Sequence, residues 1–175
     1  FNSHQVNGNV DSLEHEYVSR LIRDLEIALP QIWGRKISSI FFGGGTPSLF
    51  SARAIDTILT AVRTLVPLED QIEITLEANP GTFESKKFAD FHTAGINRLS
   101  IGIQSFHDKE LTLMNRVHNG NQAVQAVIWA QDIFENISID LLFGTPHTTF
   151  ADWQENLAIA LKLDVPHISS YALTL

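Results

Sequence analysis

The sequence predicts an α/β protein, a partial (β/α) barrel of the TIM-like kind with about five parallel strands. Short apolar runs typical of buried strands alternate with segments whose apolar residues recur at helical spacing. The pattern repeats about every 30 residues, the size of a βαβ unit, and such alternation is typical of a parallel sheet covered by helices. A closed barrel needs eight strands and about 250 residues. We therefore expect a curved, partial barrel whose remaining strands lie outside these 175 residues; an open, doubly wound sheet is the alternative.

The first predicted elements are a long helix and a short strand. Asp11 followed by Glu14 is typical of a helix N-terminus. Apolar residues then recur every four positions from Leu13 to Leu29, which predicts an apolar stripe along one helix face. Pro30 is expected to end this helix. The apolar run 37–42, which leads into three glycines, predicts the first buried strand.

Helices and strands are expected to alternate through the rest of the chain. Ser51 is a candidate N-cap for the second helix. Gly95 is expected to stop the helix that contains Phe88 and Phe91, because glycine is common just after a helix end. Further strands are predicted at 72–78, 96–104, 137–143 and 167–175, and further helices at 55–66, 124–133 and 153–161.

Composition limits the classes of function. The chain has 12 basic and 20 acidic residues, giving a net charge of −8, which counts against a nucleic-acid partner because such proteins usually carry a basic face. No run of about 18 apolar residues occurs, so no membrane span is expected. The chain contains no cysteine. This excludes a disulfide scaffold, fits a reducing cytoplasm, and means that the chain itself cannot ligate an iron–sulfur cluster through thiolates.

Ligands of parallel α/β folds bind at the carboxyl ends of the strands, and polar residues gather there in this sequence. The first predicted strand ends in Gly43-Gly44-Gly45-Thr46. Consecutive glycines let the backbone approach a ligand closely; a tight turn that touches nothing is the alternative. The segment is not a phosphate-binding P-loop, because Gly-Lys-Ser/Thr does not follow. Ala172 lies at the end of the fifth predicted strand.

Two acidic residues lie in or near apolar strands, where an unpaired carboxylate is costly. Glu77 ends the second predicted strand and could accept hydrogen bonds from an ammonium group or ribose hydroxyls; a structural ion pair with Arg98 is the alternative. Asp140 interrupts the fourth predicted strand and is a candidate for ribose hydroxyls, with an internal salt bridge as its alternative.

An amide and a guanidinium complete the candidate site. Gln104 ends the third predicted strand, where an amide could bind a ribose or a carboxylate, or could merely fix a loop. Arg116 could clamp a carboxylate, although a solvated surface charge is the usual role of a lone arginine. The seven histidines show no metal-ligand spacing. We expect most of them at the surface, with His118 and His147 near the strand ends as the two to follow.

Three segments together resemble one family in order and spacing: 41–48 (FFGGGTPS), 77–82 (EANPGT) and 95–106 (GINRLSIGIQSF). The sequence is thereby identified as similar to the radical S-adenosylmethionine (SAM) group that contains oxygen-independent coproporphyrinogen III oxidases and haem chaperones. The opening segment 1–4 resembles the stretch directly after this family's C-x-x-x-C-x-x-C motif. The resemblance implies that residues 1–175 are a radical SAM core domain truncated at both ends, without the cluster cysteines and therefore inactive alone.

The resemblance also implies cofactors and a site. A cytoplasmic protein of this family would bind SAM at a [4Fe–4S] cluster and would need an electron donor, with porphyrin or haem as partner and haem as a candidate further ligand. No metal ligand is expected within the chain. The family's SAM contacts correspond to Gly45, Thr46, Glu77, Gln104, Arg116, Asp140 and Ala172.

The resemblance leaves several functions open. The opening Phe1-Asn2-Ser3 is similar to the haem chaperone branch, whereas Asn115-Arg116 resembles the decarboxylating oxidase. A radical SAM enzyme that modifies tRNA shares the barrel, but the chain lacks a basic surface signature. A sugar-phosphate (β/α) barrel and a structural or regulatory remnant are the remaining alternatives. The haem chaperone is the leading hypothesis.

Overall fold

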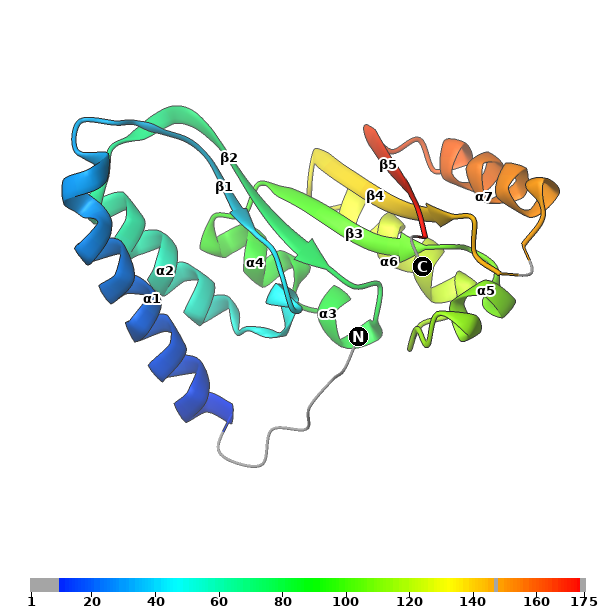
Figure 1. Ribbon diagram of the computed structural model, residues 1–175, viewed down its shortest axis with the longest axis horizontal. Coiled ribbons are helices and arrows are strands. Elements are labelled where there is room, and N and C mark those ends of the chain that lie inside the picture. The colour runs from blue at the N-terminus through cyan, green and yellow to red at the C-terminus, as the bar shows by residue number, and fades with distance from the viewer. Residues whose placement is uncertain (1–9, 147, 174–175) are drawn as a thin grey trace. The chain divides into compact units, whose positions relative to one another are not determined.

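The computed structural model describes residues 10–146 and 148–173 and contains one five-stranded sheet with the strand order β1-β2-β3-β4-β5 (Figure 1). By its internal contacts the chain divides into two compact units. One comprises Phe1–Ser38 and Phe50–Ile72, and the other comprises Ser39–Leu49 and Glu73–Leu175. The strands are β1 (Ile37–Phe42), β2 (Leu68–Ala78), β3 (Arg98–Gln104), β4 (Asn136–Phe143) and β5 (His167–Ala172). The helices are α1 (Val10–Ile32), η1 (Pro47–Leu49), α2 (Ala52–Leu65), α3 (Thr82–Ser85), α4 (Phe88–Ala94), α5 (Asp108–Leu113), α6 (Gly120–Gln131) and α7 (Phe150–Lys162).

In the first unit, helices α1 and α2 pack against each other. Ser51 caps α2 as predicted, because its Oγ accepts a hydrogen bond from Ala54 N at 3.1 Å. Glu14 accepts hydrogen bonds from Ser51 N at 2.7 Å and from Ser51 Oγ at 2.6 Å. Glu14 lies near the start of α1, as the sequence pattern predicted, and its carboxylate also contacts the start of α2.

The sequence led us to expect that Pro30 would end α1. This expectation is wrong, because the helix continues to Ile32. A proline this close to the C-terminus removes one backbone hydrogen bond from the last turn, and helix ends are commonly shifted by one or two residues. Gly34, with φ of 78°, follows the helix and turns the chain towards β1.

In the second unit, β2 pairs with β3, β3 with β4, and β4 with β5, each in parallel. Each new strand is added on the same side of the previous one, so the strand order follows the chain. A doubly wound sheet would reverse this order at a switch point. The consecutive order therefore supports the predicted barrel topology and excludes the doubly wound alternative.

Strands β3 and β4 separate an apolar face from a polar one. Side chains alternate along a strand, and the odd-numbered positions from Leu99 to Ile103 and from Ile137 to Leu141 are buried, with α6 packed nearby. On the opposite face, the even-numbered positions in the middle of the two strands carry a hydroxyl, a carboxylate or no side chain. The buried apolar residues are Leu99, Ile101, Ile103, Ile137, Ile139 and Leu141, and the opposite face holds Ser100, Gly102, Ser138 and Asp140.

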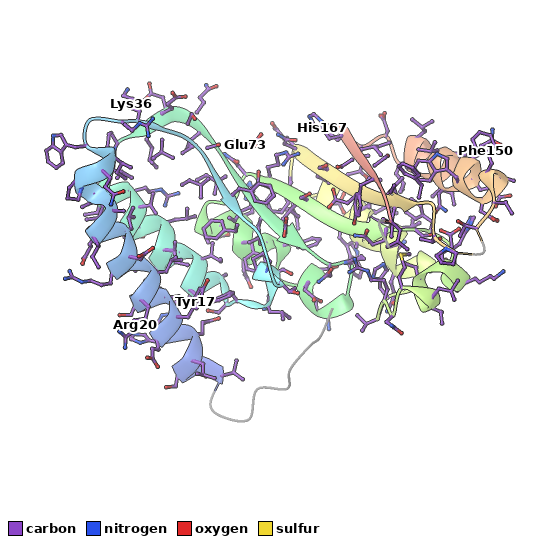
Figure 2. All side chains as sticks on the ribbon, in the orientation of Figure 1. Tyr17, Arg20, Lys36, Glu73, Phe150 and His167 are labelled. Carbon is purple, nitrogen blue, oxygen red and sulfur yellow. The ribbon has the colours of Figure 1, made fainter. Side chains whose placement is uncertain are left out.

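Other sequence expectations have mixed outcomes. Gly95 has φ of 110° and ends α4, in which Phe88 and Phe91 are fully buried, as predicted. The short helices η1 and α3 were not predicted, because a single turn has no periodic signal. Strand β2 begins at Leu68, four residues earlier than expected. Figure 2 shows His167 at the start of β5, the last strand of the sheet, whose residues are mostly exposed.

Candidate functional site

The glycine segment after β1 leaves its backbone open. Gly44 has φ of 98°, and a Cβ at Gly44 or Gly45 would meet no atom within 4 Å. The next residue, Thr46, donates a hydrogen bond from Oγ1 to Gly45 O at 2.7 Å. Gly43 differs, because a Cβ there would lie 2.8 Å from the Phe41 ring. Of the three glycines, only Gly43 is therefore crowded by neighbouring side chains, and the open backbone at the other two can face a ligand.

Glu77, at the end of β2, lies against this glycine segment. Its Oε2 accepts a hydrogen bond from Gly44 N at 3.1 Å. The alternative ion pair with Arg98 does not form: Arg98 Nε lies 3.8 Å from Glu73 Oε2 instead. The strand register explains this, since Arg98 is level with Thr75, between the two glutamates, and its side chain turns back along β2. The half-buried Glu77 carboxylate is thus held at the strand end by a backbone N–H.

Gln104 occupies an unusual turn at the end of β3. Its φ is 67°, and Ser105 N donates to Ile103 O at 2.9 Å. A three-residue turn with a positive central φ is a strained γ-turn. The pairing of β3 with β4 also shifts between Ile101 and Gln104, as at a β-bulge, which changes the direction of side chains. Such strain persists only where the surroundings enforce it.

Three elements hold this turn. From β5, the Tyr171 hydroxyl donates a hydrogen bond to Gln104 Oε1. From α7, Asn156 Oδ1 accepts from Phe106 N at 2.6 Å and from Ser105 Oγ at 3.1 Å. From the segment before α6, His118 Nε2 donates to the Ile103 carbonyl at 3.1 Å, and burial lowers the pKa of His118.

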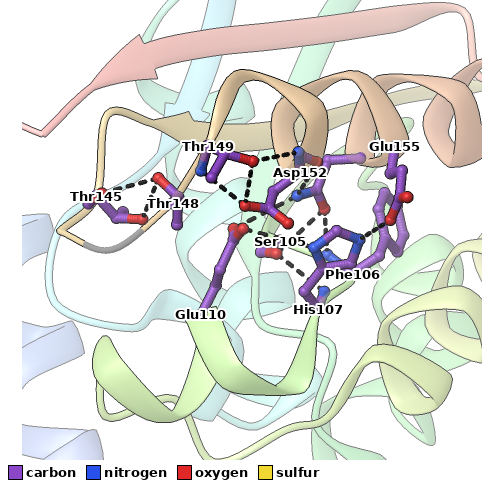
Figure 3. Close-up of polar contacts among 10 residues, drawn as sticks. Ser105, Phe106, His107, Glu110, Thr145, Thr148, Thr149, Asp152 and Glu155 are labelled. Atoms are coloured by element: carbon purple, nitrogen blue, oxygen red, sulfur yellow. Dashed lines mark hydrogen bonds and ion pairs between the residues drawn. The ribbon is translucent and has the colours of Figure 1, made fainter.

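The segment after the turn is fixed by further polar contacts (Figure 3). His107 lies between two carboxylates, with Nδ1 3.5 Å from Glu110 Oε1 and Nε2 3.4 Å from Glu155 Oε2. Thr149 caps α7 in a reciprocal arrangement with Asp152, whose Oδ2 accepts from Thr149 N at 2.6 Å. The contacts of His107 with Glu110 and Glu155 connect α5 to α7 and so support the position of residues 104–107.

Asp140 lies on the polar face of β4. Ser100 Oγ donates to its two carboxylate oxygens at 3.3 and 3.5 Å. The alternative internal salt bridge is not seen, since Asp140 makes no ion pair within residues 10–146 and 148–173. Burial raises the pKa of Asp140 above its usual value, and the nearby Glu77 charge adds to this effect. The two carboxylates therefore lie close enough to repel each other, which favours a ligand that brings positive charge or hydroxyl donors.

Arg116 and Ala172 lie at the same end of the sheet. Arg116 is half-buried, and its Nη1 reaches Asn79 Oδ1, after β2, at 3.5 Å. Its charge also acts on Tyr171, whose pKa is raised first by burial and then by the Asp140 charge. Ala172 is the last residue of β5 and pairs with Phe143. The sequence places Tyr171 on the fifth predicted strand, at the edge where ligands bind, but it did not assign Tyr171 a contact with the ligand.

The arrangement brings Glu77, Asp140, Arg116 and Gln104 to one edge of the sheet, beside open glycine backbone. This combination can bind a polar ligand that carries both charges and several hydroxyls. Among the described residues, no three His, Asp or Glu side chains are placed to hold a metal ion. His147, one of the two histidines singled out from the sequence, lies outside the described residues. No helix in the described part of the chain is long and apolar enough to cross a membrane.

Several curated relatives of this chain are named as haem chaperones. The chain is 43% identical to the heme chaperone HemW of Haemophilus influenzae and 40% identical to that of Escherichia coli, in each case over 100% of this chain and 46% of the relative. It is 42% identical to the mitochondrial radical S-adenosyl methionine domain-containing protein 1 of Bos taurus, over 81% of this chain and 32% of that protein. The chain thus spans about half or less of the length of these relatives.

Solved structures confirm the fold. Coproporphyrinogen III oxidase (HemN) from Escherichia coli, described as a radical SAM enzyme, matches with a TM-score of 0.84 at 24% identity, over 97% of this chain and 39% of that one. The archaeal Elp3 of Methanocaldococcus infernus matches with a TM-score of 0.65 at 16% identity, over 94% and 44%. The fold is therefore the predicted partial barrel. The family model of the Radical SAM superfamily matches residues 2–160, so the chain belongs to the Radical SAM superfamily.

Proposed function

We propose that this chain is the SAM-binding part of a radical SAM haem chaperone that acts in the cytoplasm. The identity of 43% and 40% to proteins named heme chaperone HemW carries this proposal. SAM would bind at the carboxyl ends of the strands, where the open backbone of the glycine segment lies beside the Glu77 carboxylate. The whole protein would then receive electrons from a donor protein and bind haem as its cargo.

The residues at the sheet edge fit the chemistry of SAM. The SAM ammonium group would be held by Glu77 and by backbone carbonyls of Gly45 and Thr46, because these groups offer acceptors beside open space. Arg116 would bind the SAM carboxylate. Gln104 and Asp140 would bind the ribose hydroxyls of SAM, and backbone groups at Ala172 would contact its adenine base. Asp140 supports this assignment most directly, since its half-buried carboxylate makes no ion pair with any described residue and gains from accepting two hydroxyl hydrogen bonds.

An iron–sulfur cluster needs thiolate ligands, and this chain has none. The cluster ligands would therefore come from outside these 175 residues. When bound, the cluster and SAM together supply one-electron radical chemistry, while the residues of this chain orient SAM and limit its contact with water.

The test uses the full-length protein with its cluster reconstituted under anaerobic conditions, and SAM binding is measured by isothermal titration calorimetry. In Glu77→Gln the side-chain oxygen can still accept from Gly44, but the charge is lost. We expect the SAM affinity to fall about ten-fold or more, the usual effect of losing one charged hydrogen bond. Glu69→Gln, an exposed change on the same strand, is the control. The proposal is wrong if the wild-type protein binds no SAM, and the role of Glu77 is wrong if both variants bind equally.

Haem binding separates the chaperone from its alternatives. Titration with haem, followed by absorbance, should give saturable binding, and an anaerobic assay should give no decarboxylation of coproporphyrinogen III. The oxidase is the second candidate, because the fold matches coproporphyrinogen III oxidase with a TM-score of 0.84. Decarboxylation with one turnover of SAM per propionate group would favour the oxidase. A tRNA-modifying role has less support, given the net charge of −8.

A further inference from the structure

A hydrogen bond links two strands that are not neighbours in the sheet. Tyr171 lies on β5 and Gln104 at the end of β3, with β4 between them. The Tyr171 hydroxyl nevertheless donates to Gln104 Oε1. Both side chains must therefore converge above the polar face of β4, the face that carries Asp140. This places the pair at the candidate SAM site.

The bond determines which end of the Gln104 amide is available. An amide has an oxygen that accepts and an NH2 group that donates. With Oε1 occupied by the tyrosine hydroxyl, Nε2 is the group that can serve a ligand. Nε2 lies over Gly102, where a Cβ would come within 2.9 Å of it and within 3.7 Å of Asn79 Oδ1. The missing side chain at Gly102 thus leaves the space that the amide nitrogen fills.

The surroundings keep the tyrosine a donor and the amide in place. Burial and the Asp140 charge raise the pKa of Tyr171, so its hydroxyl keeps its proton at neutral pH. Gln104 is 4% exposed, and its backbone is held in the strained γ-turn by Asn156 and His118 through neighbouring residues. With the backbone fixed, the remaining freedom of Gln104 is the orientation of its amide.

We propose that Tyr171 is a positioning residue that orients the Gln104 amide so that its N–H donates to an oxygen of SAM. This inference rests on the proposed function, because it assumes SAM as the ligand. Tyr171 itself need not touch SAM. Tyr171 acts through Gln104, so its contribution to SAM affinity should disappear when the Gln104 amide is removed.

The experiment is a double-mutant cycle on the full-length, cluster-containing protein with SAM binding as the readout. Tyr171→Phe should weaken SAM binding about five- to ten-fold, in line with a lost hydrogen bond. Gln104→Ala should weaken it at least as much. In the Gln104→Ala background, adding Tyr171→Phe should change the affinity less than two-fold, because coupled residues are not additive. Tyr17→Phe, the same chemical change at the other tyrosine of the chain, should have no effect.

Gly102→Ala is a second variant that leaves Tyr171 intact. The added methyl would meet the flexible end of Gln104, so the fold can adjust by moving the amide. SAM affinity should fall while the unfolding midpoint changes little. If wild-type protein binds SAM but Tyr171→Phe binds it equally well, or if its effect persists in the Gln104→Ala background, the positioning role is overturned and the proposed function stands. If wild-type protein binds no SAM, both are overturned.

Discussion

Asn156 Oδ1 accepts a hydrogen bond from the backbone N–H of Phe106 at 2.6 Å, and the same oxygen accepts from Ser105 Oγ at 3.1 Å. Asn156 Nδ2 donates to Asp152 O at 3.2 Å and to Glu110 Oε2 at 3.4 Å. This side chain is 1% exposed and uses both ends of its amide. It fixes the segment directly after Gln104 to α7 and so connects a helix that is remote from the site to the turn that forms it.

Replacing Asn156 by alanine should therefore destabilise the fold strongly. Four partners would lose a hydrogen bond, and the buried backbone N–H of Phe106 would be left without an acceptor, so we expect a loss of about 2–4 kcal/mol in the free energy of unfolding. Urea denaturation measures this change. Gln154→Ala, an exposed change on the same helix, is the control. A loss below about 1 kcal/mol would mean that the turn is held mainly by other contacts.

The His118 side chain should make stability depend on pH. Burial lowers the pKa of His118 below its usual 6.5 in the folded state. Between the two pKa values the unfolded chain binds more protons than the folded one, so stability falls as pH decreases below 6.5. His118→Gln can still donate to the Ile103 carbonyl and should show a flatter dependence between pH 7.5 and 5.5 in thermal unfolding. His15→Gln, at an exposed position, should retain the wild-type slope; equal slopes in both variants would contradict the prediction.

Asp140 should have the opposite effect on stability. Its pKa is raised by burial, so the ionised form costs stability in the folded state. The pKa of Asp140 is thus higher in the folded state than the usual value of 3.8 in the unfolded chain. When the pH falls from the folded-state pKa towards 3.8, the folded protein binds more protons than the unfolded chain. Wild-type protein should therefore gain stability relative to Asp140→Asn over this pH range. At pH 7 the variant should be as stable as wild type or more stable, while its SAM affinity falls. Urea unfolding at several pH values tests the predicted stability, and calorimetry with SAM tests the predicted loss of affinity. If Asp140→Asn is less stable than wild type at pH 7, the prediction on stability is wrong.

The glycine segment offers a comparison between two neighbouring residues. A Cβ at Gly44 or at Gly45 meets open space, but only Gly44 has a positive φ, of 98°. Gly44→Ala should cost about 1 kcal/mol of stability, because a left-handed backbone is strained for alanine, whereas Gly45→Ala should cost little. Denaturant unfolding measures both. Equal losses would mean that the backbone at Gly44 is not held in this conformation.

The sequence determined the fold class through local patterns. The alternation of apolar strands with helical stripes predicted five strands, and the glycine after α4 and the serine before α2 ended and began helices as expected. Each of these patterns is formed by a few residues that are close together in the sequence, so the sequence is enough to detect it. The Asp11–Glu14 pattern correctly marked the start of α1, but Pro30 did not end this helix, and the contact of Glu14 with Ser51 was not predicted.

The sequence also predicted that polar residues would meet at one edge of the sheet, because parallel strands place their carboxyl ends together. It could not decide what each of them contacts. Glu77 faces Gly44 and not Arg98 because the register of β2 and β3 sets Arg98 beside Thr75. Tyr171 reaches Gln104 across an intervening strand, and Asn156 holds Phe106 from fifty positions away. Such partners are brought together by the packing of distant elements, which no local pattern encodes.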